Sequence, residues 1–423
     1  MKKIIALVLV ALMCMSFMTA CGNTSNGTTD NGGAATNNNT NSGSASNSGS
    51  ASTGSTEGGA DTIKIALITN TTGDYAMYGM PVHNAAKIYF DEVNAAGGIN
   101  GKQLEVLEYD DKADGVESVN AFNLAMSKGV TAVLGSVLTG ATIALSDATY
   151  EMGVPQVTAS ATAAGVTMID PDDPNSEIRT NVFRSCFIDP FQGVKMADYA
   201  VDEYSAKTVA IFYQTGSDYS EGLLAAFEEE ADAKGLEIVK KEAFAEGDKD
   251  FKAQMTNIAS ANPDVVYMPI YYSEAGLAIT ALRAAGCDAT VLGGDGFGSV
   301  VEYASAEDLE GTVYCSGYAP GTADVADFEA KYQEVYGEPV PNMFAPLAYD
   351  AAMILCYGLT AAEEQGLTAG TEEYMAAVCD AIAAMDNVKG ITGTYSFDQY
   401  NNPIKSAAII ECTNGAETFK EMY

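Results

Sequence analysis

The side chains in this sequence that are best placed for chemistry are small hydroxyls that follow apolar runs. Thr139 ends one run and opens a helical pattern, and Ser160 and Thr162 follow another run. Hydroxyls beside the free amide groups of a helix N-terminus suit the binding of an anion such as a carboxylate. The same residue types are common helix caps, so the spacing alone leaves an anion site and simple capping equally open.

Aromatic and acidic side chains end several further apolar runs. Because ligands of open parallel sheets lie at the carboxyl ends of the strands, these residues would surround such a ligand. A tyrosine in that place is otherwise a core or rim residue, whereas a carboxylate could face an ammonium group. The residues concerned are Tyr75, Tyr78, Tyr219, Tyr271 and Tyr272, with the carboxylates Asp189 and Asp295.

The sequence offers no recognisable set of catalytic groups. Its single histidine, His83, follows Pro81 at a predicted helix start and is most simply a helix-face residue. No Gly-x-Ser-x-Gly motif occurs, and a serine triad without a paired histidine has no base. The glycine-rich segments 97–101 and 293–296 lack the Gly-Lys-Ser/Thr of a phosphate loop and are predicted turns. We therefore expect a binding protein rather than an enzyme, with no cofactor.

Metal binding is not predicted either. Asp110 and Asp111 follow a strand, where helix capping and turn formation explain them better than a cation does. The eight cysteines are irregularly spaced and form no Cys-x-x-Cys pair, which argues against a metal cluster. Most of the six that follow residue 21 sit in apolar runs and are interpreted as buried small hydrophobes, although one disulfide among them stays open.

Charge and length limit the class of protein. The 423 residues include 21 Lys+Arg and 57 Asp+Glu, a net charge of −36, which repels nucleic acid and anionic lipid. A hydrophobic content of 47% is enough for a large core, and the length indicates more than one lobe.

The N-terminal residues predict export and a lipid anchor. Lys2 and Lys3 precede a short apolar run and small residues, the pattern of a secretory signal over residues 1–20. The segment 18–22 resembles a bacterial lipobox, in which Cys21 carries lipid; an ordinary signal peptide with Cys21 incidental is the alternative. Residues 22–60 contain only Gly, Asn, Thr, Ser, Ala, Asp and Glu, so we predict that 21–60 is a lipidated cysteine with a disordered tether.

The rest of the chain alternates short apolar runs with longer amphipathic stretches, which predicts parallel sheets with helices on both faces. This pattern starts once at residue 63 and again at residue 208, so we expect two similar lobes with a cleft between them. The predicted strands are 63–69, 104–109, 131–134, 155–158, 208–213, 237–243, 265–269 and 290–292. Helices are predicted near 80–95, 116–128, 140–151, 191–203, 220–234, 250–260, 274–285, 344–363 and 371–385, before a hairpin from Gly393 to Glu411 around Asn401-Asn402.

An ordered series of short motifs over residues 61–412 resembles the leucine/isoleucine/valine-binding protein family, the substrate-binding components of ABC transporters for branched-chain and related amino acids. The motifs are TGDYAMYG (72–79), DEVNAAGGINGK (91–102), YDDK (109–112), NVFR (181–184), DPFQG (189–193), SDYS (217–220), EGDKDF (246–251), GGDG (293–296) and GTYSFD (393–398). Each piece is short, and the order of the series makes the resemblance specific.

The resemblance implies an α/β fold of two Rossmann-like lobes with parallel sheets, joined by a three-crossover hinge: the type I periplasmic binding protein fold. The crossovers would lie near 184–188, 314–318 and 391–395. Lobe one would comprise 61–184 plus 318–391, and lobe two 185–314 plus 392–423.

The resemblance also implies roles for the residues that end the strands. The family's ligand carboxylate is held at positions that match Thr139, Ser160 and Thr162. Its ligand amine meets a carboxylate that matches Asp295, assisted at the position of Asp189, and its aromatic walls match Tyr78, Tyr219 and Tyr271. Many members have Glu at the Asp295 position and Trp around the cleft, and some have a disulfide where this chain has Leu138. These departures leave the ligand's side chain open.

We therefore expect an extracytoplasmic monomer, lipid-anchored to the outer face of a bacterial cytoplasmic membrane. It would capture a branched-chain or related amino acid between its lobes and dock on the permease subunits of an ABC transporter. A sensor module that feeds a separate signalling partner is the alternative, and a surface hydrolase is disfavoured by the missing catalytic set.

Overall fold

The computed structural model describes residues 62–173 and 175–423, which belong to one compact unit. The predicted signal peptide, Cys21 and tether lie outside the described residues.

The first sheet has five parallel strands in the order β2-β1-β3-β4-β5. They are β1 (Ile63–Thr69), β2 (Leu104–Asp110), β3 (Ala132–Gly135), β4 (Gln156–Thr158) and β5 (Val182–Arg184). The helices that pack with this sheet or with one another beside it are α1 (Ala76–Ala95), α2 (Gly115–Ser127), α3 (Thr139–Met152), α10 (Phe344–Glu364) and α11 (Glu372–Ala383). β1 is apolar along almost its whole length because a parallel strand is covered on both faces. We call this group the first lobe.

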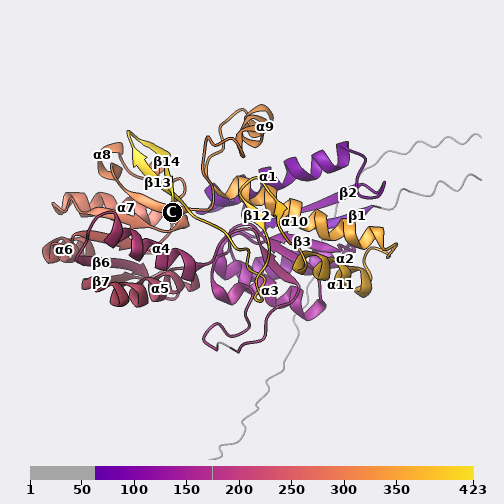
Figure 1. The fold of residues 1–423 in the computed structure, drawn as a ribbon, viewed down its shortest axis with the longest axis horizontal. Coiled ribbons are helices and arrows are strands. Elements are labelled where there is room, and N and C mark those ends of the chain that lie inside the picture. The colour runs from indigo at the N-terminus through magenta and orange to yellow at the C-terminus, as the bar shows by residue number, and fades with distance from the viewer. Residues whose placement is uncertain (1–61, 174) are drawn as a thin grey trace, which may run out of the picture. The chain divides into compact units, whose positions relative to one another are not determined.

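The second sheet has seven strands in the order β14-β13-β10-β9-β8-β6-β7. They are β6 (Thr208–Gln214), β7 (Glu237–Phe244), β8 (Val265–Met268), β9 (Thr290–Gly293), β10 (Val313–Ser316), β13 (Ala408–Thr413) and β14 (Ala416–Met422), the last two antiparallel. The helices of this group are α4 (Asp189–Asp202), α5 (Asp218–Lys234), α6 (Lys252–Ala261), α7 (Tyr272–Ala284) and α8 (Ala306–Leu309). We call it the second lobe, and Figure 1 shows β6, β7, β13 and β14 grouped apart from β1, β2 and β3.

The chain passes between the two sheets three times: between β5 and α4, between β10 and α10, and between α11 and β13. The second passage includes α9 (Ala326–Tyr336), and the third includes the short strands β11 (Val388–Lys389) and β12 (Thr394–Tyr395). The predicted α/β fold of two parallel-sheet lobes is confirmed, whereas the residue boundaries of the lobes stay a prediction.

All eight predicted strands are present, with ends shifted by two residues at most, and the predicted helices are present with their ends moved by a few residues. The short buried strands β5 and β10 were not predicted. The late hairpin was predicted in the wrong place: β13 and β14 pair around Asn414-Gly415, not around Asn401-Asn402. Asn414 and Gly415 both have positive φ, as a tight hairpin turn requires. Near Asn401 the pairing stops at a single bridge to Pro403, which has no N–H to donate to a ladder.

The start of α1 lies directly against the end of β1. A Cβ atom on Gly79 would come 1.8 Å from the carbonyl oxygen of Asn70, so only glycine fits this contact. The Asn70 side chain in turn donates to the carbonyl of Tyr75 at 2.6 Å. Together these contacts fix Tyr78 at the carboxyl end of the first sheet.

The long helix α10 is apolar enough to cross a membrane by length and composition, but 72% of its most apolar window is buried inside the protein, as expected of a core helix. Cys186, Cys287, Cys315, Cys356 and Cys412 are buried free thiols, as predicted, and Cys379 is a free, half-buried thiol. No disulfide joins the cysteines in the part of the chain that the structure describes.

Candidate functional site

Six of the eight predicted ligand-binding residues line one enclosed cavity of about 20 Å³. The first lobe contributes Tyr78, Thr139 and Ser160, and the second contributes Tyr219, Tyr271 and Asp295. Val137, Leu138, Gly296 and Phe344 complete the lining. The structure thus brings together strand ends from both sheets, as the two-lobe interpretation requires.

The other two predicted residues are buried at the same junction. Asp189 is the first residue of α4, and its N–H donates to the Thr162 carbonyl at 3.0 Å, which joins the two lobes. The Thr162 hydroxyl and the Asp189 Oδ2 atom are both buried and have no hydrogen-bond partner in the described chain. Unpaired buried polar atoms are costly, so each is suited to a ligand atom.

The hydroxyl side of the cavity is built by two loops of the first lobe. Ser160 Oγ donates to the Val137 carbonyl at 2.7 Å, which ties the loop after β4 to the loop after β3. The N-cap of α3 is Leu138, and no side chain caps it. Capping therefore does not account for Thr139, and the first amide groups of α3 remain available to an anion.

The acidic side is set by Asp295, which follows β9 and is only 2% exposed. Its Oδ1 accepts hydrogen bonds from the Gln192 amide at 3.0 Å and from the Tyr219 hydroxyl at 2.9 Å. Its own N–H donates to Gln192 Oε1 at 2.8 Å. Gln192 Nε2 also lies 3.4 Å from Asp189 Oδ1, so one amide group spans both carboxylates. In the described residues no Lys or Arg forms a salt bridge to either one.

Burial controls the protonation of this pair. It raises the pKa of Asp295 to about 6, although the hydrogen bonds from Gln192 and Tyr219 oppose the shift. It also raises the pKa of Asp189 well above its ordinary value, and the nearby Asp295 charge adds to the effect. The buried Arg184 guanidinium opposes the shift at Asp189 without a salt bridge to it, and no cation of the described chain acts in this way on Asp295. A buried carboxylate without a paired cation favours the arrival of a positively charged group such as an ammonium.

Aromatic rings form the walls between the two polar sides. Tyr219 and Tyr271 stack with centroids 4.7 Å apart and ring planes 7° apart. Tyr78 packs edge-on against Phe344 at 4.6 Å and against Tyr271 at 5.9 Å. Such rigid flat walls suit an apolar side chain placed between a carboxylate and an ammonium.

Sequence reasoning missed two residues that shape this site. Gln192 lies three residues after Asp189 and therefore on the same face of α4, a spacing that was visible in the DPFQG motif. Gly296 belongs to the segment predicted as a turn, and a Cβ atom on it would come 2.7 Å from the Tyr219 hydroxyl. The turn therefore needs glycine for the close approach of Tyr219.

The remaining candidates have structural roles. His83 lies between Thr69 and Glu108, and burial lowers its pKa. Asp110 accepts hydrogen bonds from the N–H groups of Thr71 and Lys112, and Asp111 accepts from the Ala113 N–H and the Ser118 hydroxyl, in line with the capping and turn prediction. No group of three or more His, Cys, Asp or Glu residues within the described chain could hold a metal ion.

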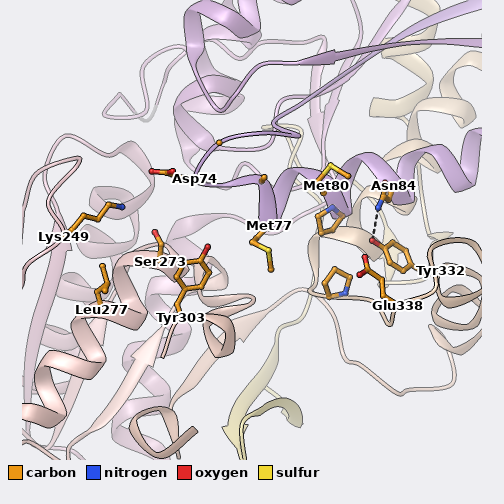
Figure 2. Close-up of a pocket in the computed structure, with 14 residues that line it drawn as sticks. Asp74, Met77, Met80, Asn84, Lys249, Ser273, Leu277, Tyr303, Tyr332 and Glu338 are labelled. Carbon is orange, nitrogen blue, oxygen red and sulfur yellow. Dashed lines mark hydrogen bonds between the residues drawn. The ribbon is translucent and has the colours of Figure 1, made fainter. Parts of the chain in front are cut away.

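A larger surface cavity, of about 850 Å³, lies beside the site (Figure 2). None of the eight predicted residues lines it. Its floor includes Met77, Met80 and Leu277, and the charge of Lys249 at its edge is paired with Glu274 at 2.8 Å. Convergent polar groups distinguish a small-molecule site from an apolar groove, so we assign the ligand site to the smaller cavity.

A family model described as periplasmic binding protein matches residues 62–417. The chain belongs to this family. It is 34% identical over 298 residues to the Leu/Ile/Val-binding protein BraC3 of Rhizobium johnstonii, which covers 70% of this chain and 78% of the relative. The predicted resemblance to leucine/isoleucine/valine-binding proteins is confirmed.

Two solved structures share the fold. The branched-chain amino acid transporter substrate-binding protein LivJ of Streptococcus pneumoniae, solved with isoleucine, has a TM-score of 0.75 at 33% identity and covers 85% of this chain and 100% of its own. The leucine-binding protein LivK of Thermotoga maritima has a TM-score of 0.76 at 30% identity and covers 85% of this chain and 98% of its own. The family is one of extracytoplasmic substrate-binding proteins rather than of enzymes.

The raised pKa of Asp295 predicts a pH-dependent stability. Because its folded-state pKa is about 6 instead of 3.8, its contribution is fully present below pH 3.8 and is lost as the pH rises through about 6. Asp295→Asn removes the charge. The free energy of unfolding of the variant, relative to the parent, should therefore rise by on the order of 1–3 kcal/mol between about pH 4 and pH 7.

Urea unfolding of both proteins across this range measures the difference. Asp218→Asn, which changes an exposed carboxylate next to Tyr219, is the matched control and should show no such rise. A parent–variant difference for Asp295→Asn that does not change with pH would contradict the burial account.

Proposed function

We propose that this chain is the substrate-binding lipoprotein of an ABC transporter, which captures a branched-chain or related amino acid between its lobes and delivers it to a permease. The observation that carries the proposal is the arrangement of one buried cavity, with an acidic side at Asp295 and a hydroxyl side at Ser160 and Thr139. That polarity matches the two charged groups of an amino-acid zwitterion.

Each end of the zwitterion has a chemical partner. The ammonium group would supply the positive charge that pairs with the Asp295 carboxylate, with Asp189 close by. The carboxylate would accept from the hydroxyls of Thr139 and Thr162, from the free amides that begin α3, and from the Ser160 hydroxyl once this turns from the Val137 carbonyl to the ligand. Such charge-assisted hydrogen bonds are about twice as strong as neutral ones, and the dry surroundings reduce their screening.

The names of similar proteins support the ligand class. BraC3 is named a Leu/Ile/Val-binding protein, LivK a leucine-binding protein and LivJ a branched-chain amino acid transporter substrate-binding protein, and LivJ was solved with isoleucine. The resemblance places Asp295 where many members of the family have Glu, so we propose that the position of the amine, and with it the preferred side chain, differs from theirs. We therefore propose the class of ligand and leave its member to a binding panel.

Capture requires the lobes to move apart. A cavity of about 20 Å³ is close to the size of one water molecule, whereas small-molecule sites usually measure roughly 300–1,000 Å³. The walls come from both lobes, and three chain passages connect them, an arrangement that suits hinge opening and closure. In this proposal the lobes are 61–184 plus 318–391, and 185–314 plus 392–423.

The proposed function predicts stabilisation by L-leucine and dependence on Asp295. L-leucine should raise the melting temperature, because a ligand that binds only the folded state stabilises it. Asp295→Ala should raise the Kd for L-leucine by about 30- to several-thousand-fold, the cost of removing one partner of a buried charge pair. Calorimetric titration measures both proteins.

Asp218→Ala, an exposed carboxylate at the start of α5, is the control and should leave the Kd within about twofold. If leucine, isoleucine, valine, threonine and alanine all fail to shift the melting temperature, the proposed ligand class is wrong. If Asp295→Ala binds as tightly as the parent, the ammonium partner lies elsewhere, and Asp189 is the next residue to test.

The proposed anchor predicts a change of location. Without the Cys21 thiol no lipid can be attached, and about 0.8 kcal/mol of membrane affinity is lost for each buried methylene. Cys21→Ala should therefore move the protein from the membrane fraction to the soluble fraction, as measured by immunoblotting of fractionated cells. Cys379→Ala is the matched control and should stay with the membrane. A membrane-bound Cys21→Ala protein would show that Cys21 is not the anchor.

A further inference from the structure

The acidic side of the site is connected to the other lobe by a chain of hydrogen bonds. The Tyr219 hydroxyl donates to Asp295 Oδ1 and accepts from the Gly296 N–H at 2.8 Å. The carbonyl of Gly296 accepts from the Tyr78 hydroxyl, which belongs to α1 in the first lobe. A ligand group on Asp295 therefore lies at one end of a series of bonds that ends in the opposite lobe.

The Tyr78 hydroxyl also accepts the N–H of Tyr272 at 3.3 Å. Tyr272 is the first residue of α7, and the N-cap Tyr271 supplies no side-chain cap. The first amides of a helix need an external acceptor, and here the acceptor comes from the other lobe.

A second bond runs the opposite way across the same junction. The Tyr272 hydroxyl donates to the Asp74 carbonyl at 2.7 Å, just before α1 begins. The Tyr272 side chain is fully buried and its ring packs on Tyr78 at 4.6 Å and on Tyr303 at 4.7 Å. Tyr272 therefore holds α7 against α1 through its backbone and its side chain together.

The larger cavity opens over this junction. Figure 2 shows Asp74 and Met77 on the α1 side facing Ser273 and Leu277 on the α7 side. Asn342 adds one more link, since its amide donates to the Met77 carbonyl at 2.8 Å and to Ser299 Oγ at 3.1 Å.

We propose that Tyr272 is a positioning residue that retains the ligand without touching it: through Tyr78 and the Asp74 carbonyl it holds the lobes closed over Asp295. This inference rests on the proposed function, because it assigns a role in amino-acid retention. It concerns the rate of release, since the bonds of Tyr272 form only when the lobes meet.

Tyr272→Phe tests the proposal because it keeps the ring and removes the hydroxyl that bonds to the Asp74 carbonyl. The dissociation rate of L-leucine should rise about 2- to 13-fold, the equivalent of one neutral hydrogen bond. The association rate should stay within about twofold of the parent. Stopped-flow tyrosine fluorescence measures both rates, since the sequence has 23 Tyr and no Trp.

Tyr336→Phe is the matched control. It removes a hydroxyl bond of the same kind, from Tyr336 of α9 to the Asn84 carbonyl of α1 at 3.0 Å, which does not involve the second lobe. The control should release L-leucine at the parent rate. A parent-like dissociation rate for Tyr272→Phe overturns the proposal, and so does an equal acceleration in Tyr336→Phe.

Small-angle scattering of the ligand-free proteins gives a second readout. Tyr272→Phe should have a larger radius of gyration than the parent and Tyr336→Phe, because closure is weaker. If the parent binds none of leucine, isoleucine, valine, threonine and alanine, the proposed ligand class fails. The radius of gyration then tests the role of Tyr272 independently of ligand binding. Equal radii for the parent and Tyr272→Phe would overturn the proposed role of Tyr272 in closure.

Discussion

The carboxylate of Asp295 is buried between two lobes, and no cation of the described chain forms a salt bridge to it. Isolated buried charge is strongly unfavourable, so this carboxylate either holds a proton or meets a positive group. Gln192 and Tyr219 fix its orientation, and Asp189 beside it adds further negative charge. The surroundings of the cavity follow from this constraint: a neutral aromatic wall, an amide that spans both acids, and hydroxyls on the far side.

The fold supplies that geometry through the ends of parallel strands. Thr139 and Ser160 follow strands of the first sheet, and Asp295 follows a strand of the second. The carboxyl ends of parallel strands lie along one edge of the sheet. The loops that follow these strands are therefore close in space even when they are far apart in the sequence. In the proposed function, the three passages between the sheets act as the hinge. Opening of the lobes moves the acidic side of the cavity away from the hydroxyl side, and closure brings the two sides together. The same junction explains why the hydrogen bonds of Tyr78 matter to both lobes.

Much of this arrangement was predictable because it depends on local patterns. Strand β1 is apolar apart from Lys64 and the final Thr69, and Thr139 and Asp295 follow shorter apolar runs, so both the sheets and the strand-end residues could be predicted. β5 and β10 are as short as several strands that were predicted, but β5 ends in Arg184 and β10 ends in Cys315-Ser316, so neither shows the apolar run that marks a buried strand. The hairpin was misplaced because two Asn-containing turns compete in the sequence, and only the ladder of β13 and β14 decides between them. Gln192 acts through Asp295, a residue 103 positions further along the chain, and Tyr272 acts through contacts between lobes; no local pattern contains either kind of contact.

The most direct test of the central claim is a crystal structure of the protein grown with L-leucine. The account predicts the ligand nitrogen within about 2.7–3.2 Å of an Asp295 carboxylate oxygen, with the ligand carboxylate against Ser160, Thr162 and the start of α3. A ligand found in the cavity lined by Met77 and Met80, or one whose amine points away from Asp295, would contradict it.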